Sequence, residues 1–141
     1  MLSEKIKSYL QQNLPQYMHL LQQMVAINSF TANPAGVNEL GRLTAAIFAP
    51  LGFTAETVQS TNALYGQHLI LTRHGRSRAG RPAPKIGLVS HLDTVFPADE
   101  ERSNDFKWRV AGDRIYGPGT VDIKGGTIMI YMILSALRAL A

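Results

Sequence analysis

Residues 86–95 read IGLVSHLDTV and residues 116–126 read YGPGTVDIKGG, and these two stretches decide the fold. The first opens with a short run that is nearly all apolar, residues 86–90, which is typical of a central strand covered on both faces of a sheet. The second is a glycine-rich loop, and an apolar stretch from Thr127 to Ala139 that we expect to be helical follows it. A buried strand, a polar loop and an apolar helix in this order indicate an α/β protein.

The first third of the chain predicts helices. Ser3 is expected to cap a first helix, and Pro15 is expected to start a second helical segment. Asn33-Pro34 is typical of a helix cap followed by proline at the first helical position, and that helix should end before Gly52.

Short strands are expected on either side of the apolar run. Residues 53–58 and 64–72 are β-prone, and residues 106–110 and 114–116 flank a turn and predict a hairpin. We therefore expect one α/β sandwich with a mixed sheet, because 141 residues are too few for two comfortable domains.

Composition excludes several classes of protein. With 45% hydrophobic and 17% charged residues the chain is neither disordered nor fibrous, and with no cysteine it has neither disulfides nor thiolate metal ligands. That is compatible with a reducing cytoplasm, which is the location we expect. The N-terminus lacks the features of a secretory signal, and the longest apolar run falls short of the ~20 residues of a membrane span, so no membrane partner is expected.

Much of the net charge of +4 comes from a basic cluster formed by Arg73, Arg76, Arg78, Arg81 and Lys85. Such a cluster could contact nucleic acid. Glycines and prolines separate its charges, however, and it contains no aromatic side chain to stack on bases. A solvated loop is the preferred interpretation, and nucleic-acid binding, testable by its salt dependence, is the weakest candidate function.

His91 and Asp93 come directly after the apolar run, where functional groups gather in open α/β sheets. At this spacing both side chains of an extended chain point to the same face. A neutral imidazole can bind a metal through one nitrogen while a carboxylate holds the other N–H. Alone, this pair is a weak signal, because a histidine at a strand end is more often a hydrogen-bonded structural residue.

Asp122 lies between glycines in the second stretch. Glycines allow tight turns and close approach to a bound group, and a carboxylate held there could bridge two cations. The alternative is an ordinary glycine-rich turn capped by Asp122. A phosphate-binding loop fits less well, because Lys124 precedes the paired glycines instead of following a glycine.

Taken together and in this order, the two stretches resemble the zinc metallopeptidase and deacylase family that includes glutamate carboxypeptidases, acetylornithine deacetylases, succinyl-diaminopimelate desuccinylases and aminoacylases. The resemblance implies the N-terminal part of a zinc-exopeptidase-like catalytic domain, residues 1–141, without the family's lid or dimerisation domain. It implies that His91 binds one metal, that Asp93 orients His91 as a catalytic residue, and that Asp122 bridges two ions. These ions are usually zinc, with cobalt or manganese as alternatives. It also implies a cis peptide bond after Asp122.

The resemblance further implies hydrolysis of an amide bond in a small peptide or N-acyl amino acid, with release of an amino acid. The family's general-base glutamate and remaining ligands follow later in its sequences. Glu100-Glu101 precedes Asp122 and is expected to belong to a solvated acidic loop. This chain is therefore expected to be inactive alone. The alternative is a non-catalytic, truncated product that binds metal weakly or pairs with a complementing chain.

Overall fold

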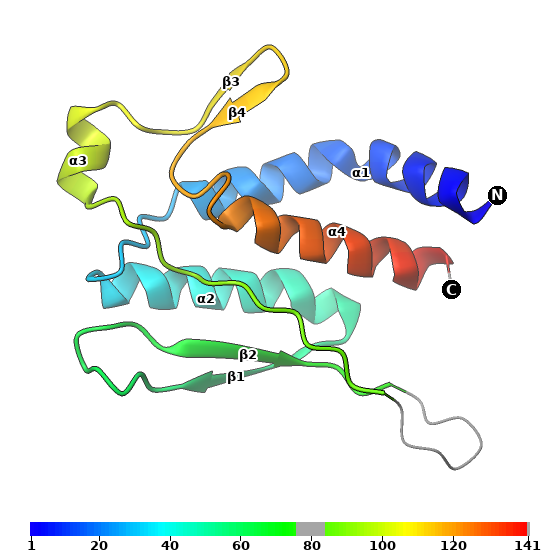
Figure 1. The fold of residues 1–141 in the computed structure, drawn as a ribbon, viewed down its shortest axis with the longest axis horizontal. Coiled ribbons are helices and arrows are strands. Elements are labelled where there is room, and N and C mark those ends of the chain that lie inside the picture. The colour runs from blue at the N-terminus through cyan, green and yellow to red at the C-terminus, as the bar shows by residue number, and fades with distance from the viewer. Residues whose placement is uncertain (76–83, 141) are drawn as a thin grey trace.

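The computed structural model describes residues 1–75 and 84–140 (Figure 1). Its α-helices are α1 (Leu2–Val25), α2 (Pro34–Phe48), α3 (Ala98–Ser103) and α4 (Lys124–Leu140), and a 3-10 turn, η1 (Ala49–Leu51), follows α2. Its strands are β1 (Thr54–Val58), β2 (His68–Thr72), β3 (Arg109–Ala111) and β4 (Arg114–Tyr116). The chain is α/β, as predicted. Arg76, Arg78 and Arg81 of the basic cluster lie outside the described residues.

The core lies where α1, α2 and α4 meet, with α1 and α4 running side by side (Figure 1). Tyr131 of α4 makes edge-to-face contacts with Tyr17 of α1, at 6.0 Å between ring centroids, and with Phe48 of α2, at 5.5 Å. The Tyr17 hydroxyl also lies 2.8 Å from the Ser135 hydroxyl. Burial raises the pKa of Tyr17, and the hydrogen bond with Ser135 offsets part of that rise. These contacts fix the position of α4 and therefore of the loop that precedes it.

Two of the expected helix boundaries are wrong and two are confirmed, since α2 also ends at Phe48, before Gly52. Asn33 caps α2 through a hydrogen bond from the Gly36 amide to its side chain at 3.2 Å. Ser3, by contrast, lies inside α1, which continues through Pro15. Proline removes one helical hydrogen bond. Apolar residues on both sides of it, Leu10 and Tyr17, nevertheless pack into the same core, and this shared burial holds α1 in one piece.

The apolar run 86–90 is extended, but the structure contradicts the expectation of a buried central strand. Ile86 is 84% exposed and Val89 is 90% exposed. A strand needs a backbone partner, and among the described residues β1 pairs with β2, β3 pairs with β4, and both pairs are antiparallel. An isolated parallel bridge joins Phe30 to Thr94. The hairpin is confirmed as β3 and β4, and the mixed sheet stays a prediction.

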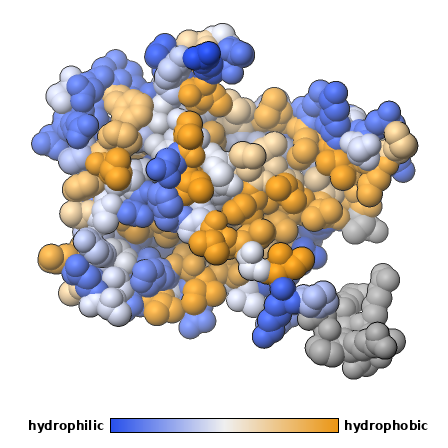
Figure 2. Space-filling view, viewed as in Figure 1, coloured by the Kyte–Doolittle hydropathy of each residue, from blue (hydrophilic) through white to orange (hydrophobic). Residues whose placement is uncertain are grey.

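One face of the molecule is strongly hydrophobic. Figure 2 shows this surface across α4 and the extended segment in front of α2. The exposed apolar side chains of these two elements include Ile86 and Val89 on the segment and Met129 and Ile133 on α4. Within residues 1–75 and 84–140, no helix has both the length and the apolar character needed to cross a lipid bilayer.

Candidate metal-binding site

The fold brings together the two polar stretches that the sequence singles out. His91 lies on the extended segment that follows residues 86–90, and Asp122 lies on the turn that leads into α4. The Nε2 atom of His91 is 2.9 Å from Oδ1 of Asp122, across 31 positions of sequence. Both side chains remain open to solvent, with His91 49% exposed and Asp122 83% exposed. The contact therefore lies at the surface of the described chain.

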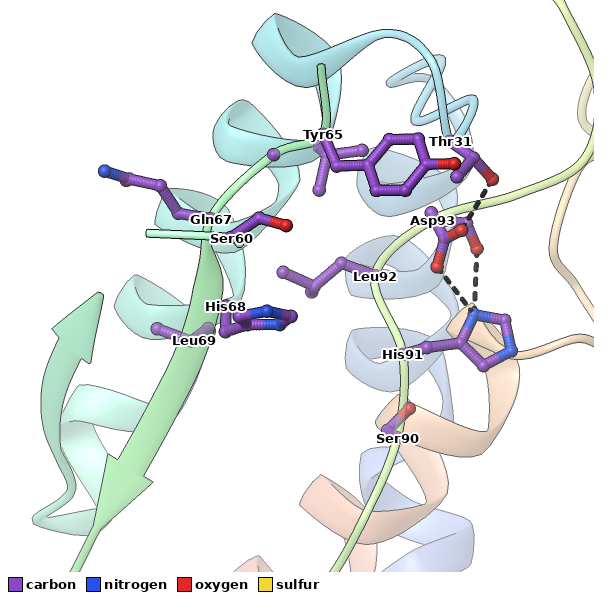
Figure 3. A pocket seen from close by; sticks show the side chains of 12 residues that line it. Thr31, Ser60, Tyr65, Gln67, His68, Leu69, Ser90, His91, Leu92 and Asp93 are labelled. Carbon is purple, nitrogen blue, oxygen red and sulfur yellow. Dashed lines mark hydrogen bonds and ion pairs between the residues drawn. The ribbon is translucent and has the colours of Figure 1, made fainter. Parts of the chain in front are cut away.

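Asp93 contacts Nδ1 of the His91 ring (Figure 3), whereas Asp122 contacts the other ring nitrogen, Nε2. The Nδ1–H of His91 donates to the backbone carbonyl of Asp93 at 3.0 Å, and the Oδ1 atom of the Asp93 carboxylate is 3.3 Å from the same nitrogen. A proton held on Nδ1 leaves Nε2, in the neutral ring, with the lone pair that a metal needs. Asp93 thus contacts Nδ1 through both its carbonyl and its carboxylate, and its orienting role stays a prediction.

Thr31 extends this chain of contacts and is a residue that the sequence did not indicate. Its hydroxyl donates to Oδ2 of Asp93 at 2.6 Å, and it also lies 3.2 Å from the Thr94 carbonyl. The backbone fixes this arrangement, since the Thr31 amide donates to the Thr94 carbonyl at 3.0 Å and the Thr94 amide donates to the Ser29 carbonyl at 2.8 Å. Thr31 is 62 positions from Asp93, so no local pattern could have revealed the pair.

Glycines shape the turn that carries Asp122, as predicted. Gly119 has φ of 79°, a left-handed conformation that favours glycine. A Cβ atom at Gly125 would overlap the backbone carbonyl of Thr120, so this close approach also requires glycine. The peptide bond between Asp122 and Ile123 is cis, which confirms that prediction.

The electrostatics of the site favour a positive charge. Burial alone lowers the pKa of His91. Its hydrogen bonds to Asp122 and to the Asp93 carbonyl, together with the charges of the two carboxylates, outweigh that effect, so the pKa of His91 is raised. An imidazolium proton then lies between His91 and Asp122. The same place suits a divalent cation, since imidazole nitrogen and carboxylate oxygen are both zinc ligands.

The described residues supply only part of a complete metal site. No group of three or more acidic, histidine or cysteine side chains converges on one point within residues 1–75 and 84–140. His91 and Asp122 therefore fit as two of the ligands of a divalent cation, and not as its whole ligand set. Glu100 and Glu101 belong to the short helix α3, and not to the loop expected from the sequence. Glu100 is exposed, as expected of a solvated pair, but the Oε1 atom of Glu101 is buried.

A cavity of about 380 Å³ adjoins the site (Figure 3). Thr31, His91 and Asp93 form part of its wall on the site side, and Tyr65 and His68 form part of its wall beside β2. His91 therefore both contacts Asp122 and lines this cavity.

Comparison with known proteins assigns these features to a family. Residues 87–141, which contain the second deciding stretch and all of the first except Ile86, match the family described as peptidase family M20/M25/M40. The chain is 32% identical to carboxypeptidase G2 of Pseudomonas sp. (strain RS-16) over 124 residues, which cover 88% of this chain and 28% of that protein. It is 32% identical to the acetylornithine deacetylase of Pectobacterium carotovorum subsp. carotovorum (strain PC1) over 132 residues, which cover 89% of this chain and 32% of that protein.

A third relative has a further acyl specificity. It is the succinyl-diaminopimelate desuccinylase of Paracidovorax citrulli (strain AAC00-1), which is 32% identical over 109 residues that cover 74% of this chain and 27% of that protein. The chain thus spans about a third or less of the length of the relatives it matches.

Proposed function

The chain belongs to peptidase family M20/M25/M40, whose members are metal-dependent hydrolases of the carboxypeptidase and deacylase type, and from this premise we propose that it forms part of a catalytic domain that hydrolyses an amide bond. The contact between His91 and Asp122, at 2.9 Å, is the observation that carries the proposal. It joins the two stretches that match the family and pairs two side chains that bind divalent metals.

Each residue of the site has a distinct role in this proposal. His91 presents Nε2 to the metal, and Asp93 holds the proton on Nδ1 and so sets the ring orientation. Asp122 presents a carboxylate that is exposed enough to bind two ions at once. When bound, a divalent cation would polarise the carbonyl of the scissile amide. We assign zinc as this cation, two ions to the complete site, and cobalt or manganese as substitutes.

The proposed substrate is a small peptide or an N-acyl amino acid. This class follows from the names of the relatives, a carboxypeptidase, a deacetylase and a desuccinylase, whose reactions share the cleavage of an amide. The product is a free amino acid.

The proposed activity needs more metal ligands than the described residues supply. A zinc site normally has three or four protein ligands, and His91 and Asp122 supply two. We propose that the 141 residues alone bind zinc weakly and do not turn over substrate. The missing ligands would come from further sequence or from a complementing chain. A truncated, non-catalytic product that pairs with such a chain is the second candidate, and the exposed apolar side chains of residues 86–89 favour it.

Isothermal titration of the 141-residue chain with zinc tests this proposal. His91→Ala and Asp122→Ala should each abolish the binding, whereas His19→Ala, which changes an exposed histidine of α1, should leave it intact. Release of amino acids from N-acyl amino acids should stay at the uncatalysed rate. If the chain binds no zinc, or if His91→Ala binds it as well as the original chain, the proposal is wrong.

A further inference from the structure

Lys124, the lysine of the second stretch, is buried although it carries a charge. It is the first residue of α4, and it is only 1% exposed. Its Nζ atom donates to the backbone carbonyl of Ile27 at 2.8 Å. Burial lowers its pKa to about 8, and the negative charge of Glu101 opposes that change. Burying an ammonium group is unfavourable unless it is compensated, so its position calls for a physical reason.

The aliphatic part of Lys124 passes directly under the turn that carries Asp122. A Cβ atom placed on Gly119 would lie 2.9 Å from Cδ of Lys124 and 3.1 Å from Cγ2 of Thr94. Gly119 therefore rests on the lysine side chain, and a larger residue would push the two apart. Because Lys124 follows Asp122 closely in the chain, its backbone and its side chain constrain the same turn from two directions.

The segments that Lys124 touches also carry buried oxygens. Ser29 follows Ile27 closely in sequence, and its backbone carbonyl accepts the Thr94 amide at 2.8 Å. The Ser29 and Thr94 hydroxyl oxygens and Oε1 of Glu101 are all buried, and none has a hydrogen-bond partner within the described residues. An ammonium group has three donors, of which Ile27 takes one. The Ile27 carbonyl and the negative charge of Glu101 both favour the ammonium form of Lys124, and this offsets part of its desolvation.

We propose that Lys124 is a positioning residue that anchors the Asp122 turn to the end of α1 and so keeps Asp122 facing His91. The anchor is the hydrogen bond to Ile27, and the packing surface is the side chain under Gly119. The consequence for metal binding rests on the proposed function, whereas the anchoring of the turn does not. Lys124 itself touches neither metal nor substrate in this proposal.

Lys124→Met tests the anchor, because methionine keeps most of the aliphatic chain and removes the ammonium group. The first readout is amide hydrogen exchange, followed by NMR, at Thr120 and Gly125, whose amides donate to Gly117 and Gly119 at 3.2 and 3.3 Å. We expect exchange at these amides to be about tenfold faster through local opening of the turn. The second readout is zinc affinity, which we expect to fall about tenfold, as for other residues that orient ligands.

Ser135→Ala is the matched control. It also removes a buried polar contact made by α4, the one with Tyr17, but at a distance along the helix from the turn. Lys124→Gln is the second variant, because it keeps a shorter donor, and it should restore part of the protection of Thr120 and Gly125. In the original chain, the Lys124 ammonium group should give a slowly exchanging ¹⁵N signal, a readout that does not depend on any variant folding.

Two results would overturn the proposal. One is exchange at Thr120 and Gly125 that rises no more in Lys124→Met than in Ser135→Ala. The other is a Lys124 ammonium group that exchanges freely with solvent in the original chain. If the original chain binds no zinc, the proposed function fails, but the exchange measurements still decide whether Lys124 anchors the turn.

Discussion

Replacing Thr31 by valine should weaken the metal site without reshaping the fold. Valine has nearly the shape of threonine, so the change removes the hydroxyl and little else. The hydroxyl donates one proton, and its 2.6 Å contact with Oδ2 of Asp93 is the shorter of its two acceptor contacts. Without that hydrogen bond Asp93 is freer to rotate, and on its Nδ1 side the His91 ring is then held mainly by the Asp93 carbonyl.

The expected magnitude follows from the geometry. A hydrogen bond to a charged group contributes about 1.5–3 kcal/mol. The Asp93 side chain is 37% exposed, so water replaces part of that interaction. We expect the free energy of unfolding to fall by about 1 kcal/mol. Residues that orient a metal ligand typically contribute 10–100-fold in affinity, and because Thr31 acts one contact further away we expect a loss of about tenfold.

The assay is zinc titration of the original chain, Thr31→Val and a control, Thr44→Val. Thr44 makes the same kind of hydroxyl contact, donating to the Leu40 carbonyl at 2.8 Å inside α2, away from His91. Both variants should lose a similar amount of stability in urea unfolding, and only Thr31→Val should lose zinc affinity. Equal zinc affinity in the two variants would refute the reasoning, because Thr31 would then be an ordinary structural hydroxyl.

Three further predictions concern the turn, the core and the surface. Gly125→Ala should lower the free energy of unfolding by about 1–3 kcal/mol, because the added Cβ would meet the Thr120 carbonyl. Gly87→Ala is the control: Gly87 has open space around it, so the free energy of unfolding should change by less than about 0.5 kcal/mol. Equal effects of the two substitutions in thermal melts would contradict this prediction. Because burial raises the pKa of Tyr17 above 10.0, the folded chain keeps a proton that the unfolded chain releases, so stability should be full below that pH and fall as the pH rises above it. Urea unfolding on either side of that pH measures this loss of stability, and the loss should be smaller in Tyr17→Phe. An equal loss in the original chain and in Tyr17→Phe would contradict the prediction. Val89→Lys should reduce self-association in sedimentation, because Val89 is 90% exposed, and a monodisperse original chain would contradict this.

The parts of the fold that the sequence predicted are those that local rules determine. Asn33 caps a helix because its side chain reaches an amide three positions ahead. The hairpin of β3 and β4 forms around a short turn, where Gly112 has φ of 62°. The family resemblance implied that His91 and Asp122 serve one metal site, and the structure places their side chains 2.9 Å apart.

The parts that escaped prediction depend on distant residues. Residues 86–90 have the composition of a buried strand, but a strand forms only where a partner backbone lies beside it. Pro15 should interrupt a helix by its local chemistry, yet packing on both sides of it keeps α1 continuous. Thr31 and Lys124 act across 62 and 97 positions, respectively, and neither has a neighbour in sequence that indicates its partner.

The central claim is that His91 and Asp122 bind one divalent cation together. The most direct test is a crystal structure of the chain grown with zinc, with anomalous scattering recorded at the zinc edge. We predict an anomalous peak about 2.0–2.2 Å from both Nε2 of His91 and an oxygen of Asp122, with Asp93 still in contact with Nδ1 of the ring. A structure in which zinc binds elsewhere, or contacts one of these two side chains without the other, would contradict it.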